Sequence, residues 1–355
     1  MGALRSRDHA RSRALVFARV LDRTMRRIVL RIGDYVFVTR PLLLIPAWSF
    51  YLLGASAGRD HAAAAPPAFY YGFLCLTAIL VTAYLLNQIF DRESDRRNDK
   101  GHFLTRGIFK VRTVVLMAAA SFLCASYLFR SAGETQRMPL VAALVLSLAY
   151  SLPPLRLVAR PVFDLLANAV GYAGVAFAAG YTAWGASSAD AAARSIPYVL
   201  LVGATFLHTT ILDANGDAEA GKITTTVAIG VARSAALSGV LAALGWVWSL
   251  AVSLPVHGDW VTVVLLTLAL VVFAAAAVRI ARRPAAATAI SSNAVQGAVA
   301  VVSVPAAIAW PWYVPLVVPI VVLSRFYYRA RFGINYPGPS DRQRSGVSGS
   351  APPPR

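Results

Sequence analysis

The stretch AFYYGFLCLTAILVTAYLLNQIF, residues 68–90, decides the class of fold. It contains no charged residue, and as a helix it is long enough to cross a hydrocarbon layer of about 30 Å. Apolar runs of comparable length recur between residues 35 and 326, without the alternation that a membrane β-barrel requires. With 57% hydrophobic residues, 14% charged residues and a mean hydropathy of +0.60, the chain is too apolar for a soluble domain. We therefore expect helices that span a membrane many times.

The predicted fold is all-α: a polytopic transmembrane helical bundle of about nine or ten helices. A transmembrane domain is expected over residues 35–331, after a basic amphipathic segment (1–34) and before a disordered tail (332–355) rich in Pro, Ser and Gly. The apolar runs give ten candidate spans, near residues 36–54, 68–90, 111–130, 139–155, 162–185, 196–213, 232–254, 259–279, 290–310 and 311–327.

The charge distribution predicts the orientation. The net charge of +18 is carried by arginines outside the spans, and short basic loops mark the cytoplasmic side of a membrane protein. An N-terminus inside the cell places the polar loops 92–112, 155–161 and 213–222 in the cytoplasm. We therefore expect a multi-pass protein of the plasma membrane with its active site on the cytoplasmic side. The basic segments are expected to contact membrane lipids and not nucleic acid, because no nucleic-acid-binding module is recognisable.

Two groups of acidic residues lie at the cytoplasmic ends of predicted spans, in the patterns Asn87-x-x-x-Asp91-x-x-x-Asp95 and Asp213-x-x-x-Asp217. Residues four apart share a helix face, so each group can direct its carboxylates at one point. Mg²⁺ prefers a few carboxylate oxygens together with phosphate oxygens and waters, so two facing groups suit a magnesium-bound diphosphate. The alternative is that these residues face solvent or pair with neighbouring arginines. Two groups on one side of the membrane favour the metal site.

Further polar residues follow the second group. Lys222 and the threonines at 224–226 supply an ammonium and hydroxyls, which are phosphate-binding groups. The nearby glycines are also compatible with an ordinary turn. This segment therefore extends the predicted diphosphate site beyond its carboxylates.

Three segments together resemble the signature regions of the UbiA superfamily of intramembrane prenyltransferases: NQIFDRESD (87–95), YSLPPLR (150–156) and DANGDAEAGKITTT (213–226) with Gly230. The resemblance runs from about residue 40 to residue 230. It implies a helical bundle with a central cavity, a Mg²⁺-bound prenyl diphosphate under a cytoplasmic cap, and transfer of the prenyl group to an acceptor. It also implies roles by position: metal and diphosphate binding for Asn87, Asp91, Asp95, Asp213 and Asp217, phosphate contacts for Arg156 and Lys222, and a place near the site for Tyr150.

The chain departs from the family pattern at several positions. Gln88 stands where an aspartate is common, the second motif begins with Thr209, and Val158 replaces a frequent lysine. Arg156 and Arg160 are four residues apart, so a short helical turn would point both the same way. We hypothesise that Arg160 takes over the role of the missing lysine in binding the diphosphate, the alternative being an anchor at the anionic membrane surface.

Asp164 and Asn168 begin another apolar span and are also four residues apart. They are candidates to line the cavity, with Asn168 as a substrate-binding residue. A helix cap and a packing hydrogen bond are the alternative roles.

Three functions fit these features. The first is magnesium-dependent prenyl transfer from a prenyl diphosphate to a hydrophobic or aromatic acceptor of quinone, lipid or carotenoid type. The second is a terpene cyclase of the same superfamily, in which the allylic cation closes on itself without an acceptor. The third is a membrane transporter, which would place intramembrane charges near the bilayer midplane. The acidic groups lie instead at one membrane face, which counts against transport.

Overall fold

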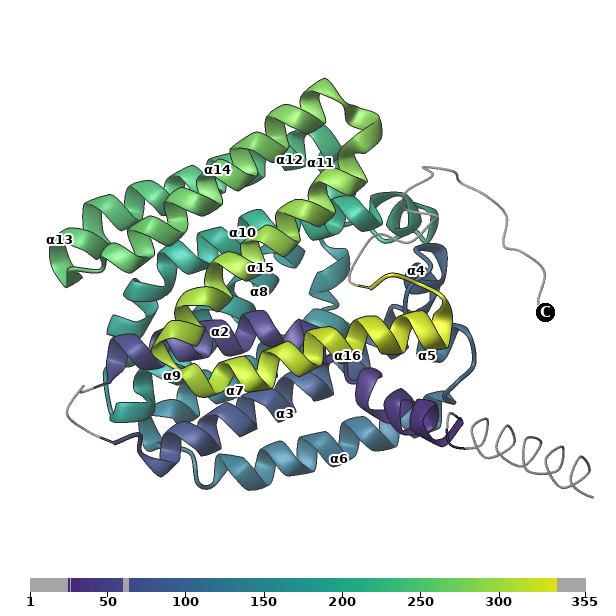
Figure 1. Ribbon diagram of the computed structural model, residues 1–355, viewed down its shortest axis with the longest axis horizontal. Helices are drawn as coiled ribbons and strands as arrows, with labels where there is room; N and C mark the ends of the chain where they lie inside the picture. The colour runs from purple at the N-terminus through teal and green to yellow at the C-terminus, as the bar shows by residue number, and fades with distance from the viewer. Residues whose placement is uncertain (1–24, 26, 60–63, 337–355) are drawn as a thin grey trace, which may run out of the picture.

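The computed structural model describes residues 25, 27–59 and 64–336, and this part of the chain is almost entirely helical, with no β-strand (Figure 1). A helix runs through residues 27–37 before the first long element. The long elements are α2 (Pro41–Gly58), α3 (Pro67–Phe90), α6 (Val111–Phe129), α7 (Glu134–Ser151), the continuous segment Phe163–Trp184 (α8, η2, α9 and η3), α10 (Ser188–Glu219), the segment Val231–His257 (α12, η4 and α13), α14 (Trp260–Arg282), α15 (Ala287–Ala309) and α16 (Val314–Phe332).

Eight of the described helical segments are long and apolar enough to cross a membrane. α7 and α16, with 18 and 19 residues, are outside this set and carry polar or charged side chains toward one end. Each of the ten predicted spans coincides with one long helical segment. The prediction of an all-α, polytopic bundle is therefore confirmed, and the chain is an integral, multi-pass membrane protein.

The start of the first span differs from the prediction. The apolar pattern suggested residue 36, but α2 begins at Pro41, after a break at Arg40, which has a φ of 55°. A proline at the first helical position suits a helix start, because its missing N–H would have no partner there. Most of the predicted surface segment 1–34, and the predicted tail after Tyr336, lie outside the described residues.

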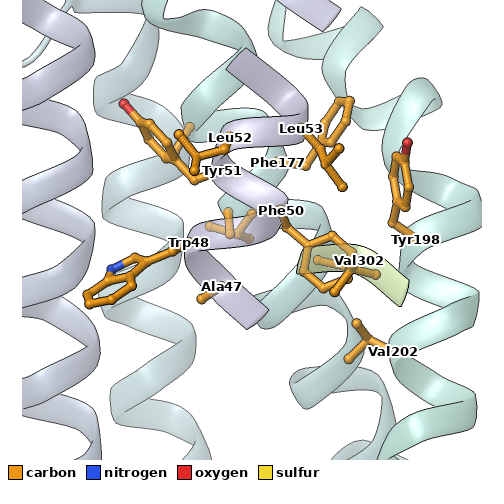
Figure 2. Packing of buried hydrophobic residues seen from close by; sticks show 14 of the residues in the cluster. Ala47, Trp48, Phe50, Tyr51, Leu52, Leu53, Phe177, Tyr198, Val202 and Val302 are labelled. Carbon is orange, nitrogen blue, oxygen red and sulfur yellow. The ribbon is translucent and has the colours of Figure 1, made fainter. Parts of the chain in front are cut away.

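The helices α2 and α9 (Ala176–Tyr181) cross at very close range. A side chain on Gly54 would collide with the carbonyl of Phe177, and one on Gly180 would collide with the carbonyl of Tyr51. Glycines at these positions let two backbones approach closely, which is how helices commonly pack in lipid. Figure 2 shows the neighbouring aromatic contacts, in which Phe50 and Phe177 lie 5.8 and 5.4 Å from the ring of Tyr198.

Four of the short elements connect long helices at the same end of the bundle. They are α4 (Arg92–Arg97), α5 (His102–Thr105), η1 (Leu157–Ala159) and α11 (Thr225–Ile229). Figure 1 shows α4 and α5 together at one end of the bundle. These elements carry or adjoin the predicted site residues. The last of the described helices, α16, packs along α2.

Candidate active site

The two acidic motifs contact each other directly. Asp91 ends α3 and precedes α4, while Asp217 lies in the last turn of α10. Ser94 Oγ, within the first motif, donates a hydrogen bond to Asp217 Oδ1, and Asn98 Nδ2 donates to the same oxygen at 3.2 Å. A side chain on Gly216 would meet the Asn98 amide, so glycine at this position leaves room for Asn98 to reach Asp217. The structure therefore brings together the two motifs that the sequence predicted to face each other.

Lys222 lies between the two motifs. The chain leaves α10 through Gly221, whose φ is +70°, and Lys222 N donates to the Asp217 carbonyl at 2.8 Å. The Lys222 ammonium is 3.2 Å from Asp91 Oδ2 and 3.7 Å from Asp217 Oδ2. Burial lowers the pKa of Lys222, but the carboxylates of Asp91, Asp217 and Asp213 outweigh burial and raise it above its usual value. The side chain is therefore a permanent cation at the centre of the site.

The other two aspartates of the motifs, Asp95 and Asp213, are called the outer carboxylates here, and each has a cationic partner of its own. Arg40 Nη2 lies 2.9 Å from Asp95 Oδ2, and Lys100 Nζ forms an ion pair with Asp213. Burial raises the pKa of the Asp95 carboxyl, while the Arg40 charge opposes that rise and Asp91 adds to it. These ion pairs therefore offset the cost of burying several carboxylates close together.

The loop after α7 adds an arginine. It contains a cis peptide bond between Pro153 and Pro154, and Arg156 has a φ of 38°. Arg156 Nη2 is 3.4 Å from Asp91 Oδ1 and donates to the Phe90 carbonyl at 3.2 Å. Arg160 instead donates to the Pro154 carbonyl at 2.8 Å, within its own loop. The structure brings Arg156 to the first acidic motif, and the described hydrogen bond of Arg160 does not reach that motif.

The remaining predicted residues lie along the same end of the bundle. Asn87 Nδ2 donates to Asp91 Oδ2 at 3.0 Å, so its side chain faces the site. Tyr150 and Asn168 are neighbours at this end of the bundle. Asp164 is fully buried and accepts from the backbone N–H of Thr225 at 2.8 Å. It therefore ties the start of α8 to the start of α11, three residues after Lys222.

Comparisons with known proteins agree with this arrangement. The sequence profile of the UbiA prenyltransferase family matches residues 43–295 of the 355. The chain belongs to the UbiA prenyltransferase family. No curated protein sequence matches it.

Solved structures of other UbiA proteins have a similar fold. A UbiA homologue from Archaeoglobus fulgidus bound to DMAPP and Mg²⁺ is 23% identical, with a TM-score of 0.60 over 76% of this chain and 99% of that one. The apo structure of a UbiA homologue from Aeropyrum pernix K1 is 17% identical, with a TM-score of 0.57 over 73% and 95%. A digeranylgeranylglyceryl phosphate synthase is also 17% identical, with a TM-score of 0.55 over 78% and 98%.

The structure explains two departures from the UbiA pattern. Gln88 is 1% exposed, and its Nε2 donates to the carbonyls of Val38 at 2.9 Å and Tyr84 at 3.0 Å. This side chain fixes the segment that leads to Arg40. Val158 is buried at 4% exposure, away from solvent. Neither residue takes the place of a charged ligand.

Sequence reasoning missed the partners of the outer carboxylates in this UbiA protein. Arg40 is 55 residues from Asp95 along the chain, and Lys100 is 113 residues from Asp213. Ser94 and Asn98, which hold Asp217, were also not identified. A signal for Asn98 and Lys100 existed, because both lie within five residues after Asp95, the last residue of the first acidic motif.

The donor set suits magnesium bound together with a phosphate compound. Within the described residues, no three His, Cys, Asp or Glu side chains form a group able to hold a metal ion on their own. Mg²⁺ is commonly held by one or two carboxylates plus substrate phosphates, and not by a cage made of protein alone. Asp91 and Asp217 approach the same ammonium, so their oxygens already converge on one positive charge. The residues therefore fit the metal that the sequence predicted.

Proposed function

We propose that this protein is a Mg²⁺-dependent intramembrane prenyltransferase, which transfers a prenyl group from a prenyl diphosphate to a hydrophobic acceptor. The observation that supports this proposal most directly is the convergence of Asp91 and Asp217 on Lys222 at one end of a bundle that lies in lipid. A diphosphate headgroup needs the polar end, and a prenyl chain needs the apolar helices beside it. The structures of the Archaeoglobus fulgidus homologue bound to DMAPP or GPP and Mg²⁺ support the same donor class.

Each side chain has a role in this proposal. Asn87, Asp91, Asp95, Asp213 and Asp217 would hold the metal ions through oxygen atoms. Bound magnesium would neutralise the negative charge that develops on the leaving diphosphate as its bond to the allylic carbon breaks. Lys222 and Arg156 would donate charge-assisted hydrogen bonds to phosphate oxygens. Tyr150 and Asn168 would lie beside the donor.

The cations that now contact the carboxylates would change partners when the donor binds. Lys222 and Arg156 contact Asp91 at 3.2 and 3.4 Å. Once metal ions occupy the carboxylate oxygens, these side chains are free to bind phosphate without leaving an unpaired buried charge. We assign Arg156 to this role. Arg160 would have to leave the Pro154 carbonyl in order to take part.

Two other functions differ from prenyl transfer in ways that the site geometry addresses. A cyclase would use the same donor site, but the cation would close on itself. A transporter is less favoured, because Asp91 lies at the end of α3 and Asp217 in the last turn of α10, not at mid-helix. We also propose that the site faces the cytoplasm and that the protein resides in the plasma membrane.

One experiment separates these functions. Purified protein is incubated with Mg²⁺ and prenyl diphosphates of several lengths, alone and with quinone-precursor, lipid-alcohol or carotenoid acceptors, and the products are identified by mass spectrometry. A product whose mass equals acceptor plus prenyl group supports the transferase. A terpene hydrocarbon formed without acceptor supports the cyclase. No release of diphosphate under any condition contradicts both enzymes.

A further inference from the structure

The last described helix, α16, is fixed to the segment that precedes the first span. The Arg331 guanidinium, near the end of α16, donates from Nε to Asp34 Oδ1 at 2.8 Å and from Nη2 to Asp34 Oδ2 at 3.0 Å. The Tyr327 hydroxyl also donates to Asp34 Oδ1. Asp34 is 4% exposed. A two-point contact between a guanidinium and a buried carboxylate is a specific, directional interaction. The family match ends at residue 295, so α16 lies beyond it.

An aromatic cluster extends this contact to the loop that follows the first acidic motif. Phe37 stacks on Tyr327 with ring centroids 4.3 Å apart, and Phe103 meets Phe332 at 5.5 Å. The ring of His102 lies 4.9 Å from that of Phe332. Three separate parts of the chain, namely the helix 27–37, α5 and the end of α16, therefore form one packed unit.

This unit carries both cations that hold the outer carboxylates. The helix 27–37 ends in the turn that presents Arg40, since Arg40 N donates to the Phe37 carbonyl at 3.1 Å. Gln88 holds the carbonyl of Val38 in the same turn. α5 begins directly after Lys100 and Gly101, and Lys100 N donates to the Asp95 carbonyl at 2.7 Å. A shift of the packed unit would therefore move Arg40 and Lys100 relative to Asp95 and Asp213.

We propose that Asp34, Tyr327 and Arg331 are positioning residues for the diphosphate site. Through them, α16 holds Arg40 and Lys100 against the acidic motifs and so sets the affinity for magnesium diphosphate. This inference rests on the proposed function, because it assumes that the site binds a diphosphate. A merely structural role of the same contacts would lower stability and leave that affinity unchanged.

The test uses the full-length protein in detergent and measures binding of inorganic diphosphate with Mg²⁺, a probe that does not depend on prenyl length. The variants are Asp34→Asn, Arg331→Gln and the double variant. Arg329→Gln is the matched control, because Arg329 is exposed near the end of the same helix. We expect each single variant to weaken binding by about threefold or more, and the double variant to be no weaker than the worse single one. The control should bind like the wild type.

Hydrogen exchange of the same variants gives a second measurement. Arg331→Gln should speed exchange of the amides in residues 36–40 and 98–107, and leave α12 and α14 unchanged. Unaltered diphosphate affinity in both single variants, losses that multiply in the double variant, or unaltered exchange in those two segments would overturn the inference. A wild-type protein that binds no magnesium diphosphate would instead contradict the proposed function.

Discussion

The ammonium of Lys222 lies 3.2 Å from Asp91 Oδ2, which joins two acidic motifs that are more than a hundred residues apart in the sequence. Asp91 is 5% exposed, and Asp217, whose Oδ2 is 3.7 Å from the same ammonium, is 2% exposed. A buried carboxylate is stable as an anion only when a cation or hydrogen-bond donors compensate it. Lys222 supplies that compensation before a donor binds, and a phosphate contact afterwards.

Replacement of Lys222 by Gln should therefore weaken donor binding. Hydrogen bonds to charged groups contribute about 1.5–3 kcal/mol, so we expect a loss of about tenfold or more in donor affinity. Donor concentration dependence of diphosphate release gives the measurement. Lys110→Gln, at an exposed position before α6, is the matched control. The same dependence on donor concentration in the two variants would show that Lys222 does not bind the donor.

The two arginines of the loop after α7 should differ in effect. Arg156 contacts Asp91, whereas Arg160 donates to the Pro154 carbonyl. We expect Arg156→Ala to reduce donor affinity by about tenfold, a value typical of a lost charge-assisted hydrogen bond, and Arg160→Ala to change it little. The assay is run in detergent, where anchoring to anionic lipid no longer contributes. A comparable loss of donor affinity in Arg160→Ala would support the hypothesis that Arg160 takes over the role of the lysine that Val158 replaces.

His102 predicts a dependence of stability on pH. Burial, followed by the charge of Arg106, lowers the pKa of His102 to about 4. In the unfolded chain its pKa is about 6.5, so between these values the unfolded state binds more protons. The stabilisation from neutral His102 is present above about pH 6.5 and is lost as the pH falls toward 4.

Replacement of His102 by Phe tests this dependence, because phenylalanine cannot titrate and can still pack against Phe332. The wild type should lose thermal stability between pH 7.5 and pH 5 more steeply than His102→Phe does. Unfolding midpoints in detergent at several pH values are the measurement. Parallel curves for the two proteins would show that His102 contributes nothing to the acid response.

The proposed orientation is testable by labelling. Arg96 and Ala218 are exposed and lie in or beside the two motifs, whereas Ser94 is buried and would react poorly as a cysteine. Cysteine is placed at each exposed position in a background without Cys75 and Cys124. A membrane-impermeant thiol reagent should label both only after the cytoplasmic side is opened. Labelling from outside intact cells would reverse the orientation.

The fold was predictable because the local sequence of each span is an apolar run long enough to cross the membrane. The residues at which the helices begin and end were harder to predict. The run that suggested a start at residue 36 crosses the break at Arg40, where the chain leaves one helix and Pro41 starts the next. The hydropathy of these residues does not indicate that the chain changes direction between the two helices. The side chains that hold this turn and the helix before it come from distant segments: Gln88 of α3 donates to the Val38 carbonyl, and Arg331 of α16 donates to Asp34.

The acidic residues of the site were predictable for a similar reason, since a spacing of four places them on one helix face. Their cationic partners were not. The pairs Arg40–Asp95 and Lys100–Asp213 depend on how the helices pack, and no local sequence pattern predicts them. Gln88 shows the same limit: its sequence position suggested a lost ligand, whereas its side chain is buried and holds a backbone carbonyl.

The requirement for both acidic motifs is the central claim, and the variant Asp91→Asn combined with Asp213→Asn tests it most directly. Asparagine keeps the size of each side chain but removes a hard anionic ligand. Diphosphate release is measured in membranes with matched protein levels, with and without Mg²⁺. The account predicts Mg²⁺-dependent release by the wild type and a loss of about a hundredfold or more in the variant, while the protein stays folded. Wild-type rates of release in the double variant would contradict the account.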